Sequence, residues 1–87
     1  MILTTKNCRV CGYKLDFFPW GEDNKIPSHE ICDCCGTEFG YEDSTIVGIR
    51  KKRNEFISSG LNWFDKKYKP SNWSFDKQLK NIPEEYL

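Results

Sequence analysis

Four of the five cysteines form two matching pairs, each followed at once by glycine, and these pairs constrain the fold more than any other feature of the chain. The pairs lie in the segments Cys8–Gly12 (CRVCG) and Cys32–Gly36 (CDCCG). In each segment two residues separate the outer cysteines, so the chain can turn back and point both sulfur atoms at one ion. The glycine that follows can take a left-handed conformation without a steric penalty. Two such knuckles predict one four-thiolate metal site, with the ligands Cys8, Cys11, Cys32 and Cys35.

The fifth cysteine, Cys34, lies inside the second knuckle. Gly36 follows Cys35 as Gly12 follows Cys11, and this alignment favours Cys35 over Cys34 as the ligand. We therefore expect Cys34 to be a free, partly exposed thiol. A redox role for Cys34 would need a lowered thiol pKa, which a sequence does not reveal.

We expect no secretory signal, because the first six residues are too few and too polar for an apolar signal core. No segment is apolar for long enough to span a membrane. We expect a cytoplasmic protein without a membrane partner, in which the thiols stay reduced, and this argues against a disulfide framework. A thioredoxin-like redox pair is disfavoured as well, because neither knuckle opens a predicted helix.

Zinc and iron both accept four thiolates in a tetrahedron. Both knuckles resemble the metal-binding motifs of rubredoxins, but the loop from Cys11 to Cys32 is shorter than the resemblance implies. The acid excess of those electron carriers is also missing, since Lys and Arg total 13 and Asp and Glu total 13. We favour one Zn²⁺ per chain and keep a rubredoxin-like iron electron carrier as an alternative.

The chain is short, with 87 residues of which 38% are hydrophobic. Such a chain has a thin apolar core, and a metal site compensates for it. We expect a single domain of the α+β class. Residues 1–43 are predicted to form a zinc ribbon, with short antiparallel strands around the rubredoxin-like knuckles. Residues 44–87 are predicted to form a helical extension that packs on the ribbon.

The predicted strands combine β-branched and aromatic residues with turn residues at their ends, and they cover residues 13–18, 28–32 and 37–41. A cap at Asp43 or Ser44 is predicted to start a helix that ends near Ser58. Ser74 is predicted to cap a short helix over residues 75–81. The predicted core aromatics are Phe39, Phe56 and Trp63.

A candidate partner-binding surface lies in the loop after the first knuckle. Aromatic side chains stand there next to proline, glycine and acidic residues, a combination typical of interface anchors. The residues concerned are Phe17, Phe18, Trp20, Glu22 and Asp23. The alternative is that these rings cover the metal site or the helix, because a small domain has few other apolar groups to bury.

Charge is divided unevenly along the chain. Residues 1–44 hold eight acids and four bases, whereas residues 45–87 hold five acids and nine bases. An acidic half of this kind favours a basic protein partner. Nucleic-acid binding is the alternative, because Arg50–Arg53 is a run of four bases. On a helix these bases spread around the axis, and the formal net charge of zero is unlike that of a nucleic-acid binder.

Catalytic residues are not predicted. Four thiolates fill the coordination shell of a zinc ion and leave no position for a reactive water. The chain has a single histidine and no glycine-rich phosphate loop. We expect a protein that is not an enzyme.

Several short segments, in this order, resemble one group of proteins: CGY, FPWG, ICDCCGTEFGYED, GIR, WF and PSNW. They are similar to those of small uncharacterised bacterial cysteine-rich zinc-ribbon proteins of the CPCC type. Some members stand beside toxin genes and are suspected immunity proteins. The resemblance implies a non-enzymatic, zinc-stabilised inhibitor that binds a bacterial toxin, with a basic toxin domain as the partner. A nucleic-acid-binding zinc ribbon of transcription or translation is the alternative.

Overall fold

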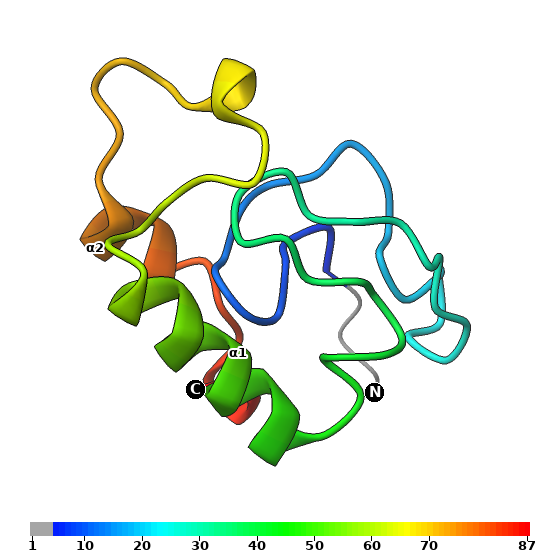
Figure 1. Ribbon diagram of the computed structural model, residues 1–87. Helices are drawn as coiled ribbons and strands as arrows, with labels where there is room; N and C mark the ends of the chain where they lie inside the picture. Colours follow the sequence, from blue (N-terminus) through cyan, green and yellow to red (C-terminus); the bar gives the residue numbers. More distant parts are fainter. Residues whose placement is uncertain (1–4) are drawn as a thin grey trace.

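The computed structural model describes residues 5–87, and the outline of this part is given by four short helical elements (Figure 1). Two are α-helices, α1 (Ile46–Ser58) and α2 (Phe75–Leu79), and two are single 3₁₀ turns, η1 (Lys66–Tyr68) and η2 (Glu84–Tyr86). The knuckles form the irregular half beside the helices. Residues 1–4, on which the expectation about a secretory signal partly rests, lie outside the described residues. No helix in the described part is long and apolar enough to cross a membrane.

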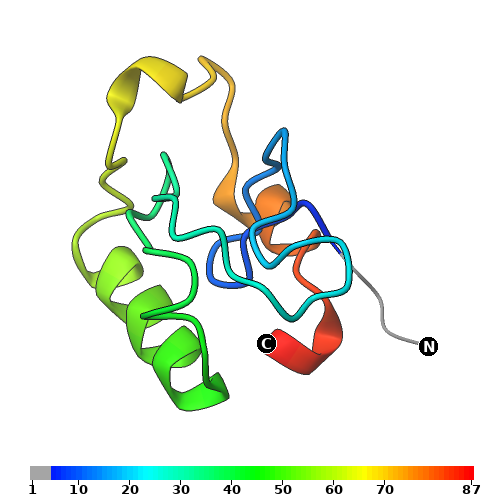
Figure 2. The same cartoon turned by 90° about the vertical axis from the view of Figure 1, so that its right-hand side faces the viewer.

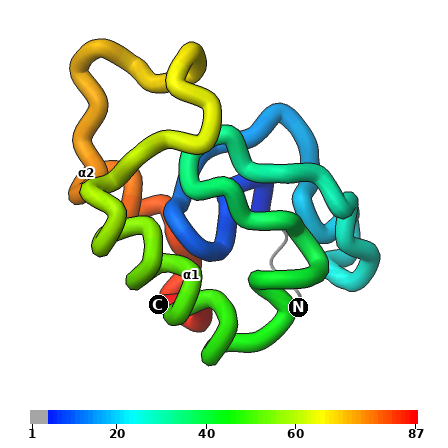
Figure 3. Tube along the Cα trace, viewed as in Figure 1, coloured from blue at the N-terminus to red at the C-terminus, as the bar shows by residue number. Residues whose placement is uncertain are grey.

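The predicted α+β zinc ribbon is wrong, because the described residues contain no strand and no sheet. Each knuckle instead closes on one isolated antiparallel bridge, Asn7 with Lys14 and Ile31 with Glu38. The tube of Figure 3 shows both knuckles as loops that return on themselves. The rubredoxin-like turn is therefore present without the antiparallel strands that we expected to extend from it.

Backbone conformation explains why pairing stops after one bridge. On the second knuckle, His29 and Gly40 lie on either side of the bridge with φ of 62° and 100°, and this left-handed backbone cannot continue an extended strand. A Cβ atom on Gly40 would lie only 2.4 Å from a side-chain carbon of Pro27. The chain must turn at Gly40, and the proline that it meets there has no N–H group to donate to a sheet.

Helix α1 begins one or two residues later than the predicted caps imply. Thr45, not Asp43 or Ser44, is its cap, and the Thr45 hydroxyl accepts a hydrogen bond from the N–H of Gly48 at 3.0 Å. The helix ends at Ser58, as predicted. Asp43 is fully buried and forms no part of this cap.

Helix α2 starts where the sequence indicated, with the Ser74 hydroxyl accepting from the N–H of Lys77 at 3.4 Å. It ends at Leu79, two residues before the predicted end. Pro83 then begins η2, which packs against α1. The C-terminal segment thus returns to the first helix.

An aromatic cluster joins the two halves of the chain. Trp63 meets Trp73 edge-on with ring centroids 5.3 Å apart, and Tyr13 of the first knuckle meets Trp63 at the same distance. Phe56 of α1 packs edge-on against Phe75 of α2 at 5.5 Å. The predicted core aromatics are confirmed, with exposed fractions from 0 to 4% for Phe39, Phe56 and Trp63.

Arg53 is the one charged residue on the buried face of α1. Its guanidinium donates to the carbonyl oxygens of Arg9 at 3.0 Å and Val10 at 2.7 Å, inside the first knuckle. It also donates to the carbonyl of Tyr86 in η2 at 2.6 Å. Figure 2 shows the knuckle loop (blue) between α1 (green) and the C-terminal segment (orange to red). The Arg53 side chain therefore links α1 to the first knuckle and to η2 by hydrogen bonds.

Arg53→Met should lower the free energy of unfolding by about 3 kcal/mol or more. The methionine keeps the apolar stem but leaves three carbonyl groups without their donor, each worth about 1–3 kcal/mol when buried. Urea unfolding of the metal-loaded protein measures this change. The matched control is Lys51→Met, at an exposed position of the same helix, for which we expect less than about 0.5 kcal/mol. Equal losses in both variants would contradict the assigned role of Arg53.

Candidate metal centre

The structure brings the sulfur atoms of Cys8, Cys11, Cys32 and Cys35 together, all within 4.8 Å of one another. Cys8 and Cys35 are 3.7 Å apart at sulfur, and so are Cys11 and Cys32. A regular tetrahedron with metal–sulfur distances of about 2.3 Å places its sulfurs about 3.8 Å apart. None of the five cysteines forms a disulfide. The four side chains therefore fit one tetrahedral metal ion.

The two knuckles build the site with the same turn. The N–H of Gly12 donates to the carbonyl of Cys8 and that of Gly36 to the carbonyl of Cys32, both at 2.9 Å. Both glycines have positive φ, 81° and 76°. Position 12 requires glycine for a second reason as well. A Cβ atom there would lie 2.2 Å from the carbonyl oxygen of Gln78. The first knuckle and the C-terminal segment approach each other at the backbone.

The site is closed to solvent. Cys8, Cys11 and Cys32 are 0% exposed, and Cys35 is 8% exposed. Four thiolates complete the tetrahedron of a zinc ion and leave no open position, which is the arrangement of a structural site. Polar groups support the sulfurs: the N–H of Val10 donates to Cys8 at 3.4 Å, and the Thr37 hydroxyl lies 3.0 Å from the sulfur of Cys35.

The second half of the chain covers both knuckles. The Gln78 amide donates to the carbonyl of Cys11 at 3.0 Å. The N–H groups of Phe64 and Asp65 donate to the carbonyls of Cys34 and Asp33 at 3.0 and 2.9 Å. Carbonyl groups that would be unpaired at the turns are thus satisfied by residues thirty or more positions away.

The charge state of the sulfurs depends on burial and on their neighbours. Burial raises the pKa of Cys8 and of Cys11 well above the ordinary thiol value. Burial acts in the same direction on Cys35, but hydrogen bonds from the other ligand thiols and from Thr37 outweigh it and hold the pKa of Cys35 below that value. Burial lowers the pKa of Arg53, and the charges of the nearby thiols oppose that change. Thiolates at this position thus favour the cationic form of Arg53.

Cys34 differs from the sequence-based expectation. We predicted a partly exposed thiol, whereas Cys34 is 0% exposed. The amide of Gln78 lies 3.4 Å from its sulfur and donates to it. Cys34 stands outside the four-sulfur cluster, and its burial is explained by the C-terminal segment that covers the second knuckle.

The aromatic residues of the predicted partner surface are half-buried and contact their own chain. The ring of Phe17 meets Phe39 edge-on, with centroids 6.2 Å apart. The amine of Lys6 lies 5.1 Å from the centre of the Phe18 ring. Glu22 and Asp23 are exposed in the turn that follows. The role of this loop in partner binding stays a prediction.

Trp20 belongs to a polar network that the sequence did not reveal. Its indole N–H donates to the carboxylate of Asp43 at 2.9 Å, and the guanidinium of Arg9 lies 4.0 Å from its ring centre. Arg9 also lies 4.5 Å from the ring centre of Tyr86 and donates to Asn24 at 2.8 Å. Burial raises the pKa of Asp43, while the hydrogen bond from Trp20 opposes that rise. No local pattern pairs these residues, because they come from four separate segments.

Comparison with known proteins gives one relative. No family model matches the chain, and no solved structure matches it. An uncharacterised Bacillus subtilis protein, YoaQ, is 31% identical over 88 aligned positions, which cover 98% of this chain and 74% of the relative. The chain belongs to the YoaQ family. Because YoaQ is itself uncharacterised, membership in its family assigns no activity to the cysteine site.

Cys35→Ser should lower the metal content of the purified protein severalfold, because it removes one of four ligands from a closed site. Cys34→Ser is the matched control, since it changes the neighbouring thiol and should leave one metal per chain. Elemental analysis together with protein quantitation measures the ratio. A loss of metal in Cys34→Ser with full retention in Cys35→Ser would reverse the ligand assignment.

Proposed function

We propose that the chain is a non-enzymatic module, held together by one Zn²⁺ ion, that works by binding another protein. The observation that carries this proposal is the closed four-sulfur site, in which the ligands are 0 to 8% exposed. Zinc in such a site stabilises a fold and leaves no position for substrate or water. We therefore assign the function of the protein to its surface and not to the metal site.

Burial of the ligands supports zinc over a redox metal. Electron exchange requires that a partner approach the metal closely, and here the second half of the chain covers both knuckles through Gln78, Phe64 and Asp65. Zinc needs no such access because it has no redox chemistry in proteins. The iron electron carrier is therefore the weaker alternative for this site.

The run Arg50–Arg53 gives little support to nucleic-acid binding. Arg53 is buried against backbone carbonyls, and Lys52 is ion-paired with Glu42 at 3.2 Å. Arg50 donates twice to the carbonyl of Leu87, at 2.9 and 3.0 Å. Three of the four bases in this run are therefore bound to groups of their own chain. The run does not form the continuous basic face that a phosphate backbone requires.

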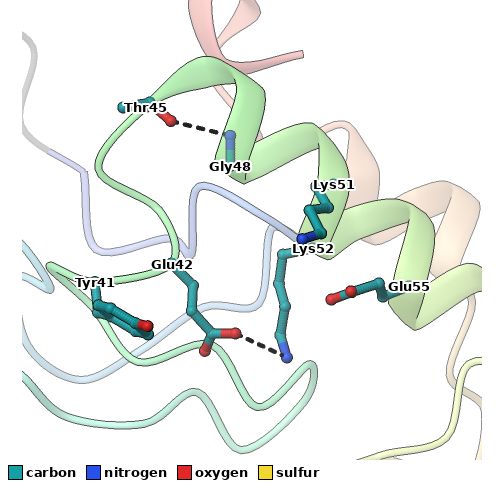
Figure 4. Close-up of a pocket in the computed structure, with 7 residues that line it drawn as sticks. All are labelled: Tyr41, Glu42, Thr45, Gly48, Lys51, Lys52 and Glu55. Carbon is teal, nitrogen blue, oxygen red and sulfur yellow. Dashed lines mark hydrogen bonds and ion pairs between the residues drawn. The ribbon is translucent and has the colours of Figure 1, made fainter.

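A groove beside α1 adds to this argument. It has a volume of about 390 Å³ and is lined by charges of both signs, Glu42 and Glu55 with Lys51 and Lys52 (Figure 4). The Glu42–Lys52 ion pair crosses it. A polyanion would meet two carboxylates here, and this mixed lining supports a protein partner instead.

The uneven charge of the chain supports a basic partner. Residues 1–44 carry eight acids against four bases, and four thiolates with one divalent ion add a further charge of about −2. Acidic surfaces accelerate the association of basic proteins. An inhibitor or immunity protein that neutralises a basic toxin, such as a nuclease, is the specific form of this proposal.

A comparative capture experiment tests the proposal. The parent protein and the variant Glu22→Lys with Asp23→Lys serve as baits in nuclease-treated lysate of the source organism. Glu84→Lys with Glu85→Lys, in the basic half, is the matched control. We expect a basic protein to be retained by the parent and the control and severalfold less by the first variant, with retention that falls as salt rises.

Two results would contradict the proposal. One is a fraction captured from untreated lysate but lost from nuclease-treated lysate, together with late elution of the protein from heparin, which would favour nucleic acid. The other is a parent protein that contains stoichiometric iron and visible charge-transfer bands in place of zinc.

A further inference from the structure

A second pocket lies where the two knuckles meet η1. Its volume is about 370 Å³. Five of its eight lining residues are apolar or aromatic, namely Tyr13, Leu15, Phe17, Ile31 and Tyr68, although polar atoms supply most of the exposed lining. Ile31 and Tyr68 are 45% and 48% exposed, although both are large and hydrophobic. The pocket therefore presents ring and aliphatic surface that its own chain does not cover.

Acidic groups surround this aromatic lining. The carboxylates of Asp16 and Asp33 line the pocket, against a single base, Lys14. Asp33 stands between the ligand Cys32 and Cys34, so the negative charge of a metal-bound thiolate cluster lies beside it. Asp65 lies next to the pocket, where its N–H donates to the Asp33 carbonyl at 2.9 Å, and its carboxylate is ion-paired with Lys67 at 3.9 Å. The lining residues thus combine aromatic rings with two acids against one base.

We propose that this pocket receives an arginine side chain of the basic protein partner, and this inference rests on the proposed function. A guanidinium stacks flat on aromatic rings and donates two parallel hydrogen bonds to a carboxylate. Tyr13, Phe17 and Tyr68 supply the rings, and Asp16 and Asp33 supply the carboxylates. The pocket, with a volume of about 370 Å³, has room for one long side chain of this kind.

The chain itself provides one example of a guanidinium held by aromatic rings. Arg9 is held between the rings of Trp20 and Tyr86, at 4.0 and 4.5 Å from their centres. The amine of Lys67 lies 5.2 Å from the ring centre of Tyr68, so the partner's arginine would displace it or take the opposite face of that ring. The partner's arginine would repeat in the open pocket what Arg9 does in the interior.

Titration of the zinc-loaded protein with a blocked glycyl-arginyl-glycine tripeptide tests this pocket directly. Two-dimensional amide NMR should show shifts that saturate at Tyr13, Phe17 and Tyr68. A matched tripeptide with citrulline, which keeps the shape but has no charge, should bind at least about tenfold more weakly. Equal binding of the two tripeptides, or shifts that avoid the pocket, would overturn the proposal.

Two double variants then distinguish binding in the pocket from non-specific attraction by negative charge. Asp16→Asn with Asp33→Asn should weaken the arginine tripeptide about tenfold, while Glu84→Gln with Glu85→Gln, the same change of charge elsewhere, should stay within twofold of the parent. Zinc content and the unperturbed amide spectrum confirm that both variants are folded. Equal weakening in both would show non-specific attraction and overturn the proposal.

Different results would contradict the arginine pocket and the proposed function. If the captured basic protein binds the Asp16 and Asp33 double variant as well as it binds the parent, the pocket is not the docking point and the proposed function stands. If the parent captures no protein at all, the proposed function fails, whatever the tripeptide shows.

Discussion

The convergence of four sulfur atoms on one point is the constraint on which the rest of the structure depends. Thiolates brought this close repel one another, and their burial without a cation would be strongly unfavourable. A divalent ion reverses that balance, and Arg53 lies close enough that the thiol charges oppose the lowering of its pKa by burial. We therefore propose that metal binding and folding are coupled in this chain, as in other small metal-held domains.

The second half of the chain depends on the same site, because it completes the two knuckles. Arg53 donates to the carbonyls of Arg9 and Val10, and Gln78 donates to that of Cys11. Helix α1 is only 13 residues long, a length at which isolated helices are marginal in water. Its stability must come from packing against the knuckles, so the helices are part of the metal-held unit.

The ligands could be predicted from the sequence because a knuckle is a local structure, set by two cysteines and a glycine within five residues. The helices could be predicted for the same reason, from caps such as Ser74 and from periodicity. The strands over residues 28–32 and 37–41 were wrongly predicted because His29 and Gly40 take left-handed backbone conformations and Gly40 closely approaches Pro27. The burial of Cys34 and the network of Arg9, Trp20 and Asp43 also depend on tertiary contacts, which no short pattern encodes.

Amide hydrogen exchange before and after removal of the metal tests the central claim most directly. After chelation, verified by elemental analysis under reducing conditions, we predict that protection is lost throughout α1 together with both knuckles, in one cooperative step. Re-addition of Zn²⁺ should restore protection in both places. Persistent protection of the α1 amides in the metal-free protein would contradict the account, because it would show that the helical half folds without the four-thiolate site.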